Sequence, residues 1–475
     1  MMEPPSTPEL ARIFALQHAA SRAIPSVPWS VRADRLRRLR ALLQDNRDAL
    51  AAAISADFGQ RSRHETELLE INPLLDGIDH SLKHGPAWMR PRRRPVSFKY
   101  QPGAAALMPQ PLGVAGIVVP WNYPLALSIG PLNGALCAGN RALVKLSELT
   151  PRFGDLMAAL VAQRFGEDEL RVFNGDAGFS RQFCLLPFDH LLFTGSTAVG
   201  HQVMRAASDS LTPVTLELGG KSPAIIGPSP MSDRQFDRLV RRLVIGKTFN
   251  AGQTCIAPDY AFVPRVRLAQ FIDSATRAVA AFYPSLGSDG DYTSIINARH
   301  FDRLKALVDD AVLRGATAWP LSRAAPDPQR RIFPPVLLSA VAPGSSVLEE
   351  EIFGPVLPVL AYDELDEALA WVNARPRPLA LYLFERDQDI VRHVLSHTVS
   401  GGVTVNDTFL HVAPESLPFG GVGASGMGAY HGEAGFRTFS HLKPVFMQSP
   451  LSLVGWLYPP FGKLAERILG MPPQP

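Results

Sequence analysis

Hydrophobic positions near the N-terminus recur at the spacing of a helix. Across residues 30–58 the apolar side chains follow one helical face, while Arg and Asp fill the other. Residues 8–23 show the same spacing, and residues 65–89 continue it as a long helix. Residues 8–23, 30–58 and 65–89 are therefore predicted to be helical. The basic run at residues 90–94 could bind an anion, but its prolines favour a solvated helix end.

From residue 113 onward, short apolar runs alternate with helical segments. Strands buried on both faces give such runs, and the alternation predicts a doubly wound α/β domain. Its strands are predicted at residues 114–119, 142–145, 170–173 and 190–193. Residues 216–226 lead into a second α/β unit, with helices predicted at 236–249, 268–282, 300–314 and 363–373, and strands at 260–263, 332–338 and 379–384.

Two segments suggest contacts outside these units. Residues 96–100 and 104–108 flank Gln101-Pro102-Gly103, which predicts a β-hairpin that pairs with another subunit or lies on the surface. The uncharged residues 100–140 are interrupted by prolines, which favours buried strands and turns over a spanning helix. Residues 451–469 are apolar but broken by Gly, Pro and charged residues. No stable membrane anchor is predicted there; a peripheral membrane contact is the alternative.

Composition narrows the classes of function. A chain of 475 residues that is 46% hydrophobic can bury a large core in two or three domains. The net charge of +3 gives no field that argues for nucleic acid. Three cysteines are too few for a disulfide framework or a zinc site, so a reducing, cytoplasmic location without a metal is predicted. The N-terminus shows no secretory signal pattern.

Two turns carry the candidate chemistry of a covalent mechanism. Cys255 lies in FNAGQTCIAPD, a turn typical of an exposed thiol with backbone N–H donors nearby. Glu217 lies upstream in TLELGGKSP, just before a Gly-Gly break. A nucleophilic cysteine and a carboxylate on two such turns suggest covalent catalysis with a general base. An unpaired cysteine is nevertheless more often inert than catalytic.

The ends of the predicted strands carry residues that suit a nucleotide. PWNYP places the Asn122 amide at a strand's carboxyl end, where α/β sheets bind ligands. Lys145 and Glu148 could hold a ribose or form a simple surface pair. The turn FTGSTAVG allows a phosphate to approach a helix N-terminus, although such turns are common without a ligand. In EEIFGPV a carboxylate precedes an aromatic residue and a Gly-Pro turn, which suits a sugar clamp or an acidic loop.

Together these stretches resemble the aldehyde dehydrogenase family. The matching blocks are PWNYP, VKLSE, FTGSTAVG, LELGGKSP, GQTCIAPD, EEIFGPV and LPFGGVGASGMG, in the family's order between Pro120 and Gly428. Finer features, such as LTPVTLELGGKSP and GMGAYHG, resemble the class 3 branch with its fatty-aldehyde and coniferyl-aldehyde dehydrogenases. WMRPRRRP and NDTFLHVAPESLPFGG most resemble the coniferyl-aldehyde group.

The resemblance implies an aldehyde dehydrogenase-like α/β fold with two doubly wound domains and a small β oligomerisation arm. The implied divisions are an NAD(P)-binding domain at residues 1–95 and 111–215, a catalytic domain at 216–402, and an arm with a C-terminal segment at 96–110 and 403–475. It implies a homodimer.

The resemblance also assigns roles. Cys255 would attack the aldehyde, Asn122 and the Cys255 N–H would stabilise the oxyanion, and Glu217 would activate the deacylating water. The implied cofactor residues are Trp121, Lys145, Glu148, Gly195, Ser196, Glu351 and Phe353. The implied substrate pocket is lined by Tyr123, Thr254, His411 and Phe419. Leu146 stands where the family usually has proline, which leaves the turn of Glu148 less rigid and NADP an alternative to NAD.

The predicted function is NAD(P)-dependent oxidation of a hydrophobic, aromatic aldehyde of the coniferyl type to its acid. Medium- or long-chain aliphatic aldehydes are the nearest alternative. A cofactor-independent cysteine esterase has no use for the ribose residues Lys145, Glu148 and Glu351. A catalytically silent scaffold would not need Cys255 and Glu217 together.

Overall fold

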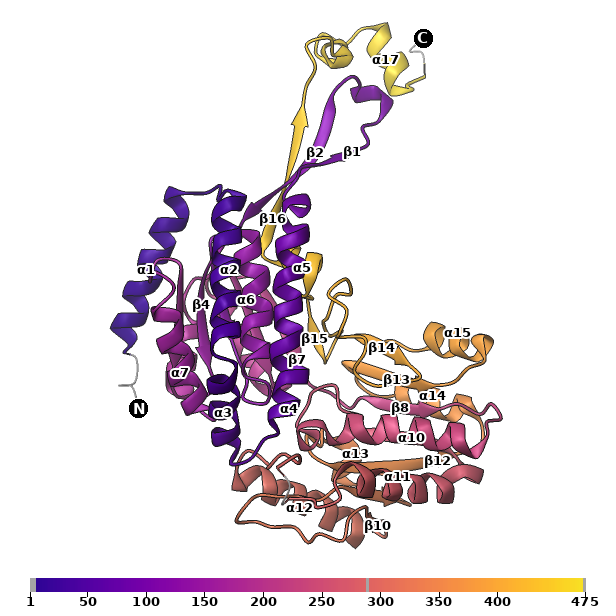
Figure 1. Ribbon diagram of the computed structural model, residues 1–475. Coiled ribbons are helices and arrows are strands. Elements are labelled where there is room, and N and C mark those ends of the chain that lie inside the picture. Colours follow the sequence, from indigo (N-terminus) through magenta and orange to yellow (C-terminus); the bar gives the residue numbers. More distant parts are fainter. Residues whose placement is uncertain (1–5, 288–289, 473–475) are drawn as a thin grey trace.

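Three β-sheets organise the chain, whose computed structural model describes residues 6–287 and 290–472. A six-stranded and a seven-stranded sheet form two α/β units, and a three-stranded sheet forms an arm that projects from them (Figure 1). The predicted α/β class with two doubly wound units and a β arm is confirmed. Within the described residues no helix combines the length and apolar composition needed to cross a membrane.

The first sheet has the strand order β15-β7-β6-β3-β4-β5. Its strands are β3 (Val114–Val118), β4 (Arg141–Leu146), β5 (Leu170–Asn174), β6 (His190–Gly195), β7 (Val214–Leu218) and β15 (Gly426–Met427). All neighbours are parallel except β15, which runs antiparallel to β7. Strands β3 and β4 are buried along their whole length, as strands covered on both faces of a sheet require, although β4 carries Arg141 and Lys145.

Helices cover both faces of this sheet (Figure 1). They are α1 (Thr7–Ala23), α2 (Trp29–Asp45), α3 (Arg47–Phe58), α4 (Arg63–Thr66), the π-helical turn η1 (Glu67–Ile71), α5 (Asn72–Trp88), α6 (Ala126–Ala138), α7 (Pro151–Ala162), α8 (Ala177–Cys184), α9 (Thr197–Ser208) and α16 (Gly432–Thr438). The single helix predicted over residues 30–58 is two helices, because the backbone leaves helical geometry at Asn46.

The prediction of strands and turns throughout residues 100–140 was wrong in its second half. Residues Ala126–Ala138 form α6, a helix that keeps Pro131 in its interior. The helix packs against α2, α5 and α16 and is buried on almost every side. This tertiary packing outweighs the hydrogen bond lost at the proline, so residue preference alone did not reveal the helix.

The second sheet has the order β10-β11-β12-β9-β8-β13-β14, parallel except at β10. Its strands are β8 (Pro223–Ile226), β9 (Tyr260–Pro264), β10 (Thr317–Pro320), β11 (Val336–Ser339), β12 (Val356–Tyr362), β13 (Ala380–Phe384) and β14 (Gly402–Val405). The accompanying helices are α10 (Asp233–Thr248), η3 (Phe249–Gly252), η4 (Arg265–Arg267), α11 (Leu268–Phe282), α12 (Ala298–Leu313), α13 (Ser346–Glu349), α14 (Leu365–Asn373) and α15 (Gln388–His397).

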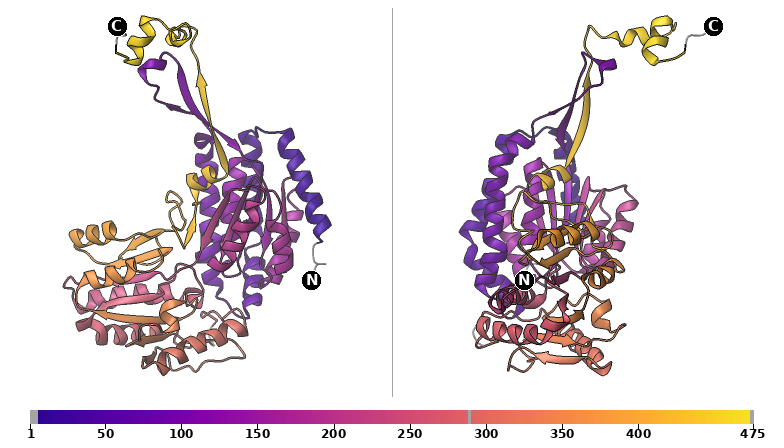
Figure 2. Two further views of the ribbon diagram at one scale, coloured as in Figure 1. Left: turned by 180° about the vertical axis from the view of Figure 1, so that it is seen from behind. Right: turned by 90° about the vertical axis from the view of Figure 1, so that its right-hand side faces the viewer.

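The arm joins segments that are far apart in sequence. Strand β2 (Ala104–Pro111) pairs antiparallel with β1 (Arg92–Arg94) and with β16 (Ser440–Met447). The tip carries η2 (Phe98–Tyr100), η5 (Leu453–Leu457) and α17 (Lys463–Leu469). Figure 2 shows the arm standing clear of both α/β units.

The predicted hairpin at residues 96–100 and 104–108 was therefore wrong in its first strand. The segment that pairs with β2 is the basic run at Arg92–Arg94. That run is therefore a strand and not the end of a helix. Pro95 follows β1 at once and has no N–H to donate to a ladder, which explains why the strand stops there. The domain limits stay predictions. The predicted boundary between residues 215 and 216 falls inside β7, a strand of the first sheet.

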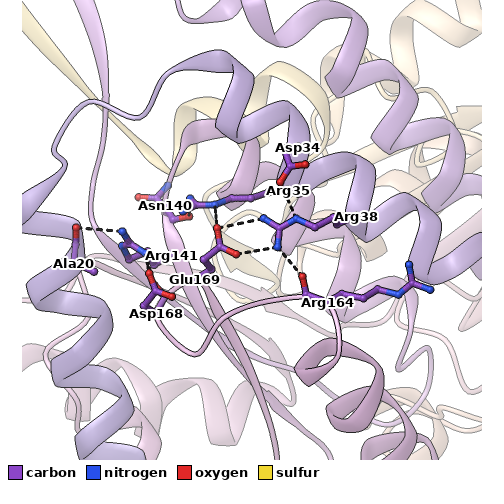
Figure 3. A network of polar contacts seen from close by, with 9 residues as sticks. All are labelled: Ala20, Asp34, Arg35, Arg38, Asn140, Arg141, Arg164, Asp168 and Glu169. Atoms are coloured by element: carbon purple, nitrogen blue, oxygen red, sulfur yellow. Dashed lines mark hydrogen bonds and ion pairs between the residues drawn. The ribbon is translucent and has the colours of Figure 1, made fainter.

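A buried ion network ties α2 to the edge of the first sheet (Figure 3). Arg35 Nε lies 3.0 Å from Glu169 Oε1, and Arg38 Nη1 lies 2.9 Å from Glu169 Oε2. Burial opposes ionisation of Glu169, but hydrogen bonds from Arg38 and Arg35 outweigh it and lower its pKa. The network lies at the start of β5, away from the strand ends that carry the candidate chemistry.

Candidate active site

The turn before Cys255 has an unusual backbone. Asn250, Ala251 and Gly252 have φ angles of 52°, 51° and 73°, three consecutive left-handed residues of which only the last is glycine. A Cβ on Gly252 would lie 2.3 Å from the carbonyl oxygen of Gly354, so no larger residue fits there. Left-handed non-glycine residues cost free energy and persist only where neighbours hold them. Such backbone strain is typical of a functional turn.

Hydrogen bonds join this turn to the turn that carries Asn122. The Asn122 Nδ2 donates to the carbonyl oxygen of Gln253 at 3.1 Å, and Asn250 Nδ2 donates to the carbonyl oxygen of Asn122 at 2.9 Å. Gln253 is buried and bonds the backbone of residues 250, 294 and 296. The structure thus brings the predicted Asn122 amide and the Cys255 turn together.

The Cys255 thiol faces two carboxyl groups. Burial, and after it the charges of Glu351 and Glu217, raise the pKa of the Cys255 thiol to about 12, against the effect of nearby backbone N–H groups at residues 255 and 256. The thiol is therefore neutral at pH 7 in this structure. A thiolate requires a base or a compensating positive charge.

Glu217 lies on β7 opposite Thr194 of β6 and Gly426 of β15. Its side chain is buried, and neither carboxyl oxygen has a hydrogen-bond partner among the described residues. Burial alone raises its pKa well above the ordinary carboxyl value. A carboxyl group with a raised pKa and free oxygens is suited to accept a proton from a water molecule.

The Gly-Gly break after β7 makes room for Glu351. A Cβ on Gly219 would lie 2.1 Å from Glu351 Oε2, so this approach requires glycine. Glu351 Oε1 is buried without a partner among the described residues. Burial first, then the charge of Asp259, raises the pKa of Glu351 to about 8. Nearby, Phe353 has a φ of 50° and meets the edge of Trp121 at 5.4 Å between ring centroids.

Sequence reasoning missed Lys221, which holds this region together. Its Nζ lies 2.5 Å from Asp259 Oδ2 and donates to the carbonyl oxygens of Val347 and Glu350 at 2.8 Å each. It therefore ties the segment after Cys255 to the loop that carries Glu351. Lys221 stands within the quoted motif LELGGKSP, so its position was visible but its role was not.

Lys145 and Glu148 lie at the carboxyl end of β4. Lys145 Nζ is 3.4 Å from Glu148 Oε2; the lysine is buried and the Glu148 carboxylate is 46% exposed. Burial lowers the pKa of Lys145, although Glu148 opposes the shift. Because Lys145 is buried, the two residues are not a simple ion pair on the surface.

Gly195 and Ser196 join β6 to α9. Ser196 caps the helix, with its Oγ accepting from the Val199 N–H at 3.4 Å. A Cβ on Gly200 would lie 2.7 Å from Leu218, so the small residue lets α9 approach the sheet. The helix N-terminus thus lies at the same sheet edge as Lys145, because β4 and β6 flank β3 in parallel.

The predicted substrate residues form two groups. Tyr123 and Thr254, next to Cys255, bond through their hydroxyls at 2.8 Å. His411 bonds Thr404 through Nδ1 at 2.9 Å and lies 6.4 Å from Phe419 between ring centroids. Burial lowers the pKa of His411 to about 4, so this imidazole is neutral.

Two tyrosines that sequence reasoning did not select connect these groups. Tyr382 donates to the carbonyl oxygen of Ile256 and lies 6.0 Å from the His411 ring. Tyr430 lies 5.7 Å from Phe419, and after burial the charges of Glu217 and Cys255 raise its pKa further. Tyr430 stands in GMGAYHG, a motif quoted above only for its resemblance. Together these side chains give a largely aromatic surround to Cys255.

A sequence model described as "Aldehyde dehydrogenase family" matches residues 6–445. A probable coniferyl aldehyde dehydrogenase of Pseudomonas aeruginosa is 50% identical over 97% of this chain and 95% of its own length. A coniferyl aldehyde dehydrogenase of Pseudomonas sp. strain HR199 is 50% identical over 89% of this chain and 87% of its own length.

Solved structures agree with this match. The substrate-bound state of Staphylococcus aureus AldH has a TM-score of 0.91 and 34% identity, covering 97% of this chain and 99% of that one. An aldehyde dehydrogenase of Mycobacterium tuberculosis, solved in complex with NAD+, has a TM-score of 0.84 and 26% identity, covering 95% and 92%.

Proposed function

The chain belongs to the aldehyde dehydrogenase family and is an aldehyde-oxidising enzyme, and on that premise we propose that its substrate is a hydrophobic, aromatic aldehyde of the coniferyl type. The carrying observation is the 50% identity to a probable coniferyl aldehyde dehydrogenase over 97% of this chain and 95% of that one, and to a coniferyl aldehyde dehydrogenase over 89% and 87%. The aromatic surround of Cys255 supports it, because Tyr382, Phe419 and Tyr430 form a packed aromatic environment on that side of the site.

The residues at the sheet edge fit a nicotinamide cofactor. Glu351 carries a buried carboxyl oxygen that has no hydrogen-bond partner in the described part of the chain, and Lys145 is a buried cation at a strand's carboxyl end. The N-terminus of α9 at Ser196 suits a pyrophosphate. We propose that Glu351 and Phe353 hold the nicotinamide ribose against Trp121, and that Lys145 and Glu148 hold the adenosine ribose.

The proposed cofactor is NAD, with NADP as the alternative. An ionised Glu148 can accept hydrogen bonds from a ribose 2′-OH and repels a 2′-phosphate. Its side chain is 46% exposed and contacts Lys145 at its inner end, so the carboxylate has room to turn away. With Glu148 turned away, the 2′-phosphate of NADP would also be accepted.

The first half of the proposed reaction takes place at Cys255. Once a base has taken the proton of the Cys255 thiol, the thiolate attacks the carbonyl carbon, and the carbonyl electrons move to the oxygen of a thiohemiacetal. The Asn122 amide and the Cys255 N–H donate to this oxygen, and each such donor typically contributes on the order of 100- to 1,000-fold in rate. When bound, the cofactor accepts the hydride whose loss leaves a thioester on Cys255.

The second half is deacylation. Glu217, as carboxylate, accepts a proton from water while the water oxygen attacks the thioester carbon. The C–S bond breaks, the carboxylic acid leaves, and the sulfur departs as thiolate. The two oxygens of Glu217, which accept no hydrogen bond from residues 6–287 and 290–472, support this assignment.

A substrate comparison tests the proposal. We expect kcat/KM for coniferaldehyde to exceed that for every member of a C4 to C12 alkanal series, measured with NAD and again with NADP. A kcat/KM for a medium- or long-chain alkanal above that for coniferaldehyde would replace the proposal with the aliphatic alternative. No reduced cofactor with any aldehyde would contradict both.

We further propose that the chain works as a homodimer in the cytoplasm. Phe446 and Met447 at the end of β16 are 50% and 58% exposed, and Leu451 beyond them is 80% exposed. Large apolar side chains gathered on a projecting arm are typical of a surface that another subunit covers. The three free cysteines suit a reducing compartment.

A further inference from the structure

A cluster of buried charges lies behind the two catalytic turns and has no part in the mechanism above. Arg61 and Glu70 have no exposed side-chain surface, and Glu65 is 6% exposed. Charged side chains are almost never fully buried unless they are paired, because desolvation is costly. Burial raises the pKa of Glu65 to about 7 even though Arg61 opposes the shift. Such a costly arrangement calls for a compensating role.

Arg61 and Glu70 hold the turn that carries Asn122. Arg61 Nη2 lies 3.0 Å from Glu70 Oε1, while Nη1 donates to the backbone carbonyl of Asn122 at 3.0 Å. The guanidinium also lies 4.8 Å from the centre of the Tyr123 ring. Glu70 Oε2 accepts both backbone N–H groups of residues 125–126 at 2.9 Å. The turn is therefore fixed on both sides of Asn122.

Glu65 holds the other turn. Its Oε2 accepts the backbone N–H of Asn250 at 3.0 Å and the hydroxyl of Thr293 at 3.0 Å. Asn250 is one of the left-handed residues before Cys255, and its side chain bonds the same Asn122 carbonyl that Arg61 reaches. One buried cluster thus contacts both turns. Arg61 and the Asn250 side chain both donate to the carbonyl oxygen of Asn122.

The π-helical turn explains how one segment serves both turns. Glu65 and Glu70 are five residues apart, which would place them about 140° apart around an α-helix. The chain instead forms η1 at Glu67–Ile71, where the i→i+5 pattern brings residues five apart to one side. Both carboxylates consequently face Arg61, whose charge acts on the pKa of each.

We propose that Arg61, Glu65 and Glu70 are positioning residues that fix the Asn122 amide relative to the Cys255 N–H, so that both donors meet the oxyanion. The inference rests on the proposed roles of Asn122 and Cys255. It assigns the buried cluster an effect on the transition state as well as on stability.

Arg61→Lys tests the inference. A lysine keeps one positive charge for Glu70 but lacks the planar fork that reaches Glu70 and the Asn122 carbonyl together. We expect kcat/KM for aldehyde to fall on the order of 100-fold, as small misplacements of reacting groups do. We expect NAD binding, measured by fluorescence titration, and Cys255 alkylation by iodoacetamide in the free enzyme to stay within about twofold.

A double-mutant cycle with Asn122→Ala separates positioning from stability. If Arg61 acts through Asn122, adding Arg61→Lys to the Asn122→Ala enzyme should lower kcat/KM by less than about threefold. Glu169→Gln is the matched control, since it breaks another buried Arg–Glu contact on the same domain and should change Tm but not kcat/KM. Should Arg61→Lys not fold, Glu65→Gln, which keeps an acceptor oxygen for Asn250, enters the same cycle.

Three results would overturn the inference. An Arg61→Lys enzyme with wild-type kcat/KM would show that the Asn122 contact is dispensable. If the fold-losses in kcat/KM of the two single variants multiply in the double variant, Arg61 acts independently of Asn122. A wild-type rate for Asn122→Ala would remove the proposed oxyanion role and the inference with it. Because all ratios are taken on whichever aldehyde the enzyme oxidises, a wrong substrate class leaves the test intact.

Discussion

At the scale of single residues, protonation state decides what the site can do. In this structure Cys255 is a neutral thiol and Glu217 has a raised pKa, both mainly because they are buried. Burial of this kind is costly for stability but keeps proton transfers under the control of neighbouring groups.

Replacing Cys255 by serine should reduce aldehyde oxidation by more than about 1,000-fold, because a serine hydroxyl cannot form the thioester. Reduced-cofactor formation and intact-mass measurement of an acyl adduct are the readouts. Cys137→Ser is the control. Cys137 is buried in α6, and burial raises its pKa to about 12. The Cys137→Ser enzyme should therefore keep most of its activity. Substantial turnover by Cys255→Ser would refute the covalent mechanism.

Glu217→Gln should separate the two halves of the reaction. The thiolate can still attack and the first hydride leave, but a neutral amide cannot take the proton of the deacylating water. Rapid mixing should show up to one NADH per site, then a steady rate lower by on the order of 100-fold or more. Loss of the burst together with turnover would show that Glu217 acts earlier, for example by deprotonating Cys255.

The same residue predicts a pH dependence. The carboxylate is the active form, and burial raises the pKa of Glu217, so deacylation should be slow in acid and rise with pH through that raised pKa. Single-turnover decay of the acyl-enzyme between pH 5 and 9 measures this. The rising limb should be absent in Glu217→Gln; its persistence there would assign it to another group.

At the scale of elements, strand ends and helix contacts place these residues. The turn after β4 carries Glu148, and Glu148→Gln should raise the kcat/KM ratio of NADP to NAD by up to about tenfold, because it removes a charge that repels a 2′-phosphate. Glu167→Gln removes an exposed carboxylate elsewhere and should leave the ratio unchanged. Equal loss with both cofactors would contradict the ribose assignment.

The contact between α2 and the first sheet should matter for stability. Glu169→Gln leaves the buried Arg35 without a charged partner and should lower the free energy of unfolding by about 3 kcal/mol. Glu167→Gln, which breaks an exposed pair with Arg12, should cost less than about 1 kcal/mol. Urea denaturation at pH 7 measures both. Similar losses would contradict the role of burial.

The sign of the pH effect follows from the lowered pKa of Glu169. Its contribution is present above the ordinary carboxyl pKa and is lost as pH falls through the lowered folded-state pKa. The difference between wild type and Glu169→Gln should therefore shrink in acid.

At the scale of the whole molecule, the arm is the proposed dimer contact. Phe446→Glu with Met447→Glu should convert the proposed dimer to a monomer, because two charges would enter the covered surface. Light scattering after size-exclusion chromatography gives the mass. Leu313→Glu, at an 88% exposed position on α12 far from the arm, should leave the dimer intact. A monomeric wild type would refute the proposed assembly.

The sequence by itself determined the two α/β units and the positions of the candidate chemistry. Uncharged runs such as Val114–Val118 identify two-sided strands because every side chain in them must be buried. Cys255, Glu217 and Glu351 could be selected because each lies in a short motif whose glycines are required locally, as Gly219 shows beside Glu351.

Only the tertiary structure decided the rest. Helix α6 and the pairing of Arg92–Arg94 depend on neighbours far along the chain, so local patterns predicted them wrongly. The link from Glu65 to Asn250 spans 185 residues, and no periodicity encodes such a contact. Protonation states likewise depend on the burial that packing creates around each group. Local preferences act within a few residues, whereas burial and charge pairing are properties of the folded whole.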